Sequence, residues 1–173
     1  MSRRKNHSSI IRTINSLNKE KGSYQFELVI VGAHDTAYGG KIKLKYSSDT
    51  VKFLGKQSKQ SIQGLMSQSD VFALLSKVET FGIVYAEALS QGLPVIYTAD
   101  QGFDGWLNDR TLAIPVRSGN ESDFKNALTS MQKRSSINPT AIEFAAKSFD
   151  WNIVCKTLSE IYLSITANSR QSN

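Results

Sequence analysis

Residues 71–97 read VFALLSKVETFGIVYAEALSQGLPVIY. The stretch begins with a short apolar run, Val71–Leu75, and closes with a second one, Val95–Tyr97, and both are typical of buried strands. Between them, residues 82–91 have the length and composition of a helix, which would end at the following Gly92. A strand, a helix and a strand joined by short connections form a unit whose strands are parallel. The segment therefore predicts an α/β fold.

The same alternation extends along the chain in both directions. Further strands are expected at residues 26–32, 51–55 and 112–114, and further helices at residues 7–20, around 62–66, 121–133, 139–146 and 151–167. Residues 33–40 are expected to form a loop, while residues 42–48 fit either a strand or a short helix. The pattern predicts a doubly wound, Rossmann-like parallel sheet over residues 1–167, followed by a frayed tail at 168–173.

Composition and length exclude several classes of protein. A chain of 173 residues with 40% hydrophobic content can bury a core of its own, and its single Cys155 cannot form an internal disulfide. No apolar run approaches the roughly 20 residues of a membrane helix, and no apolar signal core follows the basic N-terminus. No Gly-x-Gly-x-x-Gly follows a predicted strand, which argues against a dehydrogenase. These features predict a cytoplasmic domain, free or at the inner face of the membrane.

Charge is distributed unevenly along the chain. Residues 1–59 contain twelve Lys and Arg against four Asp and Glu, whereas residues 60–173 contain nine against eleven. The basic part fits an anionic partner such as a phosphorylated ligand or an anionic membrane, or simply a solvated surface. No basic stripe is interleaved with aromatic residues and no zinc-finger or RNA-binding signature is present, so nucleic acid is not expected.

Two carboxylates frame the start of the helix at residues 82–91. Glu79 lies in the loop after a strand, where doubly wound folds bind ligands, and Glu87 is the only charged residue between Thr80 and Ala99. The first N–H groups of the helix would form an anion site. Carboxylates on both sides of a phosphate site suit a ligand with hydroxyls on both sides of a diphosphate, as in a nucleotide sugar. The alternatives are that Glu79 only stabilises the helix dipole and that Glu87 faces water.

The segment Glu79–Glu87, followed by residues 88–96 (ALSQGLPVI), resembles the E-x7-E segment of retaining GT-B glycosyltransferases, the glycosyl transferases group 1 type of family 4. Further matches are Arg4-Lys5-Asn6, the strands near residues 29–32, 51–55 and 69–72, the loop Gln101–Gly105 and Phe149-Asp150-Trp151. The resemblance covers residues 3–165 and only the donor-binding C-terminal half of such enzymes. It implies the C-terminal half of the GT-B fold.

The resemblance also implies roles for individual residues. Glu87 would hold the ribose hydroxyls, Glu79 would contact the donor sugar near its anomeric carbon, and Lys5 would neutralise the distal phosphate. The remaining donor-binding positions are the backbone of Phe81, Gly82 and Ile83 for sugar and diphosphate, and Gly55 and Lys56 for the base. No metal is implied, because Asp100 and Asp104 form no convincing pair for Mg²⁺. His34 is interpreted as a loop residue.

By the same resemblance, the chain is expected to be the donor-binding half of a hexosyltransferase of polysaccharide biosynthesis. It would transfer a hexose, with retention, to a glycan or lipid-linked acceptor. The expected donor is a UDP-sugar or, second, a GDP-sugar, with no other cofactor. The alternative is a non-catalytic nucleotide-binding module or subunit derived from such an enzyme.

Two parts of the family pattern have no counterpart in residues 1–173. One is the N-terminal domain that would supply the acceptor site, so this chain alone is expected to be inactive. The other is the first strand of the donor domain, which would precede Lys5 and carry an arginine. Without this strand, two central strands of the sheet would have unpaired edges, which favours self-association. A peripheral association with a membrane is a further expected partner interaction.

Overall fold

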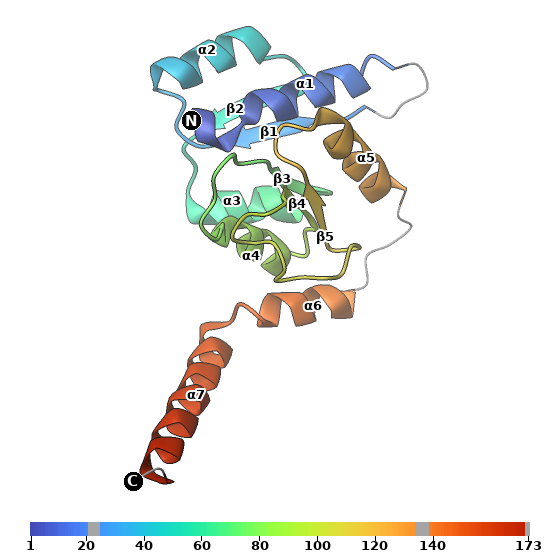
Figure 1. Cartoon of the computed structure of the whole chain (residues 1–173). Coiled ribbons are helices and arrows are strands. Elements are labelled where there is room, and N and C mark those ends of the chain that lie inside the picture. Colours follow the sequence, from blue (N-terminus) through green and yellow to red (C-terminus); the bar gives the residue numbers. More distant parts are fainter. Residues whose placement is uncertain (21–24, 134–138, 172–173) are drawn as a thin grey trace.

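A computed structural model describes residues 1–20, 25–133 and 139–171 and shows alternating strands and helices (Figure 1). The strands are β1 (Leu28–Val31), β2 (Val51–Gly55), β3 (Phe72–Leu74), β4 (Val95–Thr98) and β5 (Ala113–Val116). After a short 3₁₀ helix, η1 (Arg3–Lys5), the helices are α1 (His7–Leu17), α2 (Ala37–Tyr46), α3 (Lys59–Ser67), α4 (Ile83–Ser90), α5 (Glu121–Gln132), α6 (Pro139–Lys147) and α7 (Trp151–Gln171). The predicted α/β alternation is confirmed.

The region after β1 differs from the sequence-based expectation. The predicted loop continues only as far as Thr36, because helix α2 begins at Ala37 and extends to Tyr46. Thr36 starts this helix by accepting a hydrogen bond from the N–H of Gly39 at 3.0 Å. The segment at residues 42–48 is therefore mainly helical. At the other end of the chain, α7 continues past the expected end at Ala167 to Gln171.

The strands form two parallel sheets with a gap in the expected order. β1 pairs with β2, and β4 lies between β3 and β5; no sheet pairing joins β1 to β3 in the described part of the chain. Two N-terminal contacts bridge the carboxyl ends of these two strands. The Met1 ammonium donates to the carbonyl of Ala33 after β1, and the N–H of Lys77 after β3 donates to the carbonyl of Arg4 at 2.7 Å.

Helix α1 packs against both sheets and so holds them in one body. Ile10 and Ile14 belong to a core cluster with Ile96 of β4, whereas Ile11 packs in a second cluster with Ile30 of β1. A third cluster lies under α4, where the fully buried Tyr85 donates its hydroxyl to the carbonyl of Leu74 at 2.8 Å. The cores therefore fix the carboxyl ends of β1 and β3 relative to the start of α4.

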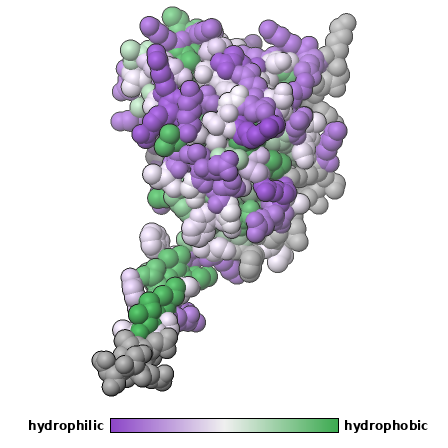
Figure 2. Space-filling view, in the orientation of Figure 1, coloured by the Kyte–Doolittle hydropathy of each residue, from purple (hydrophilic) through white to green (hydrophobic). Residues whose placement is uncertain are grey.

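Helix α7 leads away from this body and exposes an apolar surface (Figures 1 and 2). Its exposed large apolar residues are Trp151, Ile153, Leu158, Ile161, Tyr162, Leu163 and Ile165. Within the described residues, no helix is both long and apolar enough to cross a membrane.

Candidate functional site

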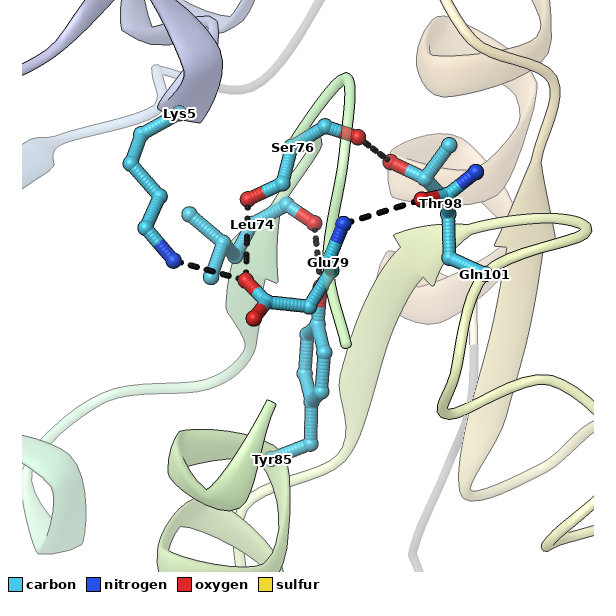
Figure 3. A network of polar contacts seen from close by, with 7 residues as sticks. All are labelled: Lys5, Leu74, Ser76, Glu79, Tyr85, Thr98 and Gln101. Atoms are coloured by element: carbon cyan, nitrogen blue, oxygen red, sulfur yellow. Dashed lines mark hydrogen bonds and ion pairs between the residues drawn. The ribbon is translucent and has the colours of Figure 1, made fainter. Parts of the chain in front are cut away.

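Lys5 and Glu79 meet at the carboxyl end of β3 (Figure 3). The Lys5 Nζ lies 2.6 Å from Glu79 Oε2, and the same oxygen accepts a hydrogen bond from the Ser76 hydroxyl at 3.2 Å. The Glu79 side chain is 12% exposed and that of Lys5 is 39% exposed. The structure thus brings together two residues that are 74 positions apart in the sequence, at the edge where a ligand was expected.

A tight turn places Lys5 above β3. Asn6 adopts the left-handed conformation, with φ at 52°, and joins η1 to α1. Asparagine tolerates this conformation better than most residues, and Asn6 is buried. Together with the hydrogen bond between Lys77 and Arg4, the turn fixes the backbone on either side of Lys5.

The loop of Glu79 is joined to the loop after β4. The Gln101 side chain accepts a hydrogen bond from the N–H of Glu79 at 2.9 Å (Figure 3). The N–H of Gly102 donates to the carbonyl of Glu79 at 3.2 Å. The Thr98 hydroxyl donates to the carbonyl of Ser76 at 2.8 Å. Glu79 is therefore held by backbone contacts on both sides, and its carboxylate is preorganised.

Sequence reasoning missed Ser76, Thr98 and Gln101. Each is polar and lies at or just beyond the carboxyl end of β3 or β4. Polar residues at that position of a parallel sheet are the signal that could have found them.

Gly82 shapes the start of α4. It precedes the helix with a φ of +80°, and a Cβ on it would lie 2.4 Å from the ring of Tyr85. Both the conformation and the lack of space require glycine. Phe81 packs beside it against Phe103, with ring centroids 6.3 Å apart, and Ile83 is exposed. The predicted anion site at Phe81, Gly82 and Ile83 thus lies at a helix start whose geometry is fixed.

Glu87 is placed differently from Glu79. It lies on α4, about 6 Å along the helix axis from Ile83 by the standard rise, and it is exposed. It is not part of the network in Figure 3. The geometry is compatible with either a ribose contact or a solvated residue, so the role of Glu87 stays a prediction.

Gly55 and Lys56 lie at the carboxyl end of the other sheet, after β2. Gly55 has a φ of +71°, and a Cβ on it would lie 3.3 Å from Cε1 of His34. The Nε2 of His34 accepts a hydrogen bond from the Lys43 ammonium, with 3.1 Å between Nε2 and Nζ. Lys56 is exposed. No contact joins Gly55 or Lys56 to Lys5 or Glu79 among the described residues.

The carboxylates of Glu79 and Asp104 have different hydrogen-bond partners. Burial raises the pKa of Glu79, but the hydrogen bond and charge of Lys5, helped by Ser76 and the N–H of Thr80, hold it below its usual value. Asp104 accepts hydrogen bonds from the Tyr97 hydroxyl and the N–H of Asp100, both at 2.8 Å. Within the described ranges, no group of three or more His, Cys, Asp or Glu is placed to hold a metal ion.

His7, the first residue of α1, is kept neutral. Burial, together with the positive charges of the N-terminal ammonium and Lys5, lowers its pKa to about 4. Its Nδ1 is buried and makes no hydrogen bond with the described residues. Protonation would therefore place a second positive charge beside Lys5.

We expect His7 to make the protein less stable in mild acid. Its pKa is lower in the folded than in the unfolded chain, so the unfolded chain binds more protons as the pH falls from about 6.5 to about 4. The free energy of unfolding should fall by about 2–3 kcal/mol over this window. Urea denaturation at pH 7, 5.5 and 4.2 measures the effect, and His7→Gln should lose less stability. An equal loss in both proteins would show that His7 is not the group responsible.

The edge thus combines a cation, a low-pKa carboxylate and a helix start above parallel strands, an arrangement typical of the ligand-binding edge of Rossmann-like folds. Residues 1–147 match the family model described as glycosyl transferases group 1. The chain belongs to this family. Its fold matches the C-terminal domains of GT-B glycosyltransferases, so the predicted resemblance and fold class are confirmed.

Named relatives agree with this assignment. D-inositol 3-phosphate glycosyltransferase of Corynebacterium kroppenstedtii is 24% identical over 94% of this chain and 38% of its own length. Sucrose-phosphate synthase from Thermosynechococcus elongatus superposes with a TM-score of 0.76 at 20% identity, over 96% of this chain and 44% of the other. Anabaena Alr3699/HepE, solved in complex with UDP-glucose, superposes with a TM-score of 0.75 at 22% identity, over 95% of this chain and 46% of the other. The chain spans less than half the length of these proteins.

Proposed function

We propose that this chain is the donor-binding half of a glycosyltransferase that transfers a hexose from a nucleoside diphosphate sugar to a glycan or lipid-linked acceptor, with retention. The observation that carries the proposal is the Lys5–Glu79 pair, with 2.6 Å between Nζ and Oε2, beside the start of α4. Membership of the family supports the reaction class. The solved complex of Anabaena Alr3699/HepE with UDP-glucose favours a UDP-sugar over a GDP-sugar.

Each residue of the pair has a distinct part in the proposed reaction. The bond between the anomeric carbon and the diphosphate oxygen breaks, and its electron pair goes to that oxygen. The acceptor hydroxyl forms the new bond to the anomeric carbon, and its proton passes to the departing diphosphate. Lys5 stabilises the charge that grows on the leaving diphosphate, together with the N–H groups of Gly82 and Ile83. Glu79 is ionised at neutral pH because its pKa is low, so it accepts hydrogen bonds from sugar hydroxyls and donates none.

Donor and acceptor would be held by different parts of a whole enzyme. Glu87 is proposed to accept the ribose hydroxyls, and Gly55 and Lys56 to contact the base. The acceptor site would come from an N-terminal domain, so residues 1–173 alone would bind the donor without transferring its sugar. This division of roles fits a cytoplasmic protein, which would act at the inner face of the membrane when its acceptor is a lipid. The second candidate is a nucleotide-binding module or subunit without catalysis, which would bind its nucleotide at the same Lys5–Glu79 edge.

Titration with nucleoside diphosphates tests the proposal. UDP should give saturable heat in calorimetry, with a dissociation constant on the order of 1 mM or below, and GDP and ADP should bind more weakly. Circular dichroism on the same sample confirms that the protein is folded. A folded sample that binds none of the three nucleotides would contradict the proposal.

A further inference from the structure

Trp106 is a half-exposed aromatic residue in the loop that also contributes Gln101. Its side chain is 55% exposed, although tryptophan is the largest apolar residue. Its indole N–H already donates to the carbonyl of Gly102 at 3.1 Å. The surface it offers to solvent is therefore an apolar ring whose polar group is satisfied within the loop.

Neighbouring rings fix the orientation of Trp106. Its ring packs edge-to-face against Phe81, with centroids 5.2 Å apart and planes at 87°. A second contact, at 6.0 Å, joins it to Phe149. A ring that is already held in one orientation loses little conformational entropy when a ligand covers it.

The loop of Trp106 is also fixed relative to Glu79. Besides the two hydrogen bonds that join the loops, Gly102 lies so close to the preceding loop that a Cβ on it would be 1.5 Å from the carbonyl oxygen of Thr80. The loops therefore cannot separate without breaking these contacts. Trp106 therefore packs on Phe81 from a loop that is fixed to the loop of Phe81 and Glu79.

We propose that Trp106 is a binding platform for a hexose ring. One face of a pyranose presents C–H groups, which pack on an aromatic ring, while its hydroxyls project from the rim toward carboxylates such as Glu79. This inference rests on the proposed function, because that function is what brings a sugar to this edge. The hexose belongs either to the donor or to a glycan acceptor that extends from the N-terminal domain's site onto this edge; both offer the same chemistry, and the experiment separates them.

Fluorescence detects a sugar on this platform directly. The sequence contains two tryptophans, so Trp151→Phe leaves Trp106 as the sole reporter. UDP, UDP-glucose, and maltose with saturating UDP are titrated while its emission is followed. A response to UDP-glucose beyond that to UDP assigns the donor hexose, and a response to maltose assigns an acceptor hexose. If calorimetry shows that UDP-glucose binds and neither sugar changes the emission, the inference is overturned.

Dissociation constants of Trp106 variants provide the second test. Trp106→Ala should weaken binding of the sugar that gave the response by roughly three- to tenfold, with UDP affinity unchanged, and Trp106→Phe should keep most of the affinity. Trp151→Ala is the matched control, because Trp151 is 77% exposed on α7. Equal weakening of UDP and UDP-glucose by Trp106→Ala would show a structural role and overturn the inference. If the unaltered protein binds no nucleotide, the proposed function itself fails.

Discussion

An N-terminal extension that supplies one apolar strand before Met1 is expected to raise the melting temperature of this protein by about 10 °C. β1 and β3 are parallel to their partners, β2 and β4, yet they are not paired with each other in the described structure. The N–H groups of Leu28 and Gly32 point toward β2, so Val29 and Val31 direct their backbone groups to the opposite edge. The same reasoning places the backbone of Ala73 at the free edge of β3, because Phe72 donates to Pro94.

The N-terminal contacts show where such a strand would enter. Met1 and Arg4 are bonded to residues that follow β1 and β3, so a strand parallel to both would finish at Met1. Each backbone group that gains a partner in a buried position is worth about 1–3 kcal/mol. A gain of about 3–4 kcal/mol corresponds to roughly 10 °C at this chain length. The same strand should suppress self-association, because unpaired strand edges pair with other chains.

Ten added residues that contain a Val/Ile-rich strand, compared with ten Gly and Ser residues, isolate the effect. Calorimetric melting follows stability, and light scattering follows mass. The apolar extension should melt higher and be monomeric, whereas the Gly/Ser extension should behave like the unextended chain. If the unextended chain is monomeric and melts no earlier than the strand-bearing one, another segment fills the gap or the strand order is wrong.

The elements that could be predicted from the sequence are those whose apolar residues form a short run of strand length. Val51–Gly55 and Val95–Tyr97 have no competing pattern, and the structure has strands at both. The start of α2 could not be predicted in this way. Ile42, Leu44 and Tyr46 alternate with lysines in the sequence, as in a strand. In the structure Ile42 is buried and Leu44 is exposed, because they lie on different sides of a helix that is capped by Thr36.

The candidate site was predictable to the extent that its residues lie in one motif. Glu79, Gly82 and Glu87 could be selected from spacing alone, whereas Lys5 depended on a family resemblance. The hydrogen bond from Glu79 to Gln101 joins residues 22 positions apart. Such a contact depends on which loops become neighbours at the sheet edge, and the local sequence pattern does not encode this. Trp106 went unnoticed for the same reason, since its importance lies in its contact with Phe81.

Glu79→Gln and Glu87→Gln are expected to change ligand binding in two different ways. Glu79 lies beside Lys5 and is proposed to contact only the sugar, so its replacement should weaken UDP-glucose binding by about tenfold to a hundredfold. UDP should bind as well as before or more tightly, because the variant loses a negative charge and frees the Lys5 ammonium. Glu87 is proposed to hold the ribose, so its replacement should weaken UDP and UDP-glucose by the same factor, about tenfold.

Calorimetry with both ligands on both variants distinguishes these patterns, and Glu143→Gln is the matched control. Glu143 is a surface carboxylate that pairs with Lys147 on α6 at 2.8 Å, so its replacement should leave both affinities unchanged. Denaturation should show losses below about 1 kcal/mol for all three variants, because glutamine keeps the shape of each side chain and the ion pairs are exposed or partly exposed. Unchanged affinities in Glu87→Gln would mean that Glu87 faces water. A fall in UDP affinity in Glu79→Gln would mean that this carboxylate organises the phosphate site rather than the sugar site.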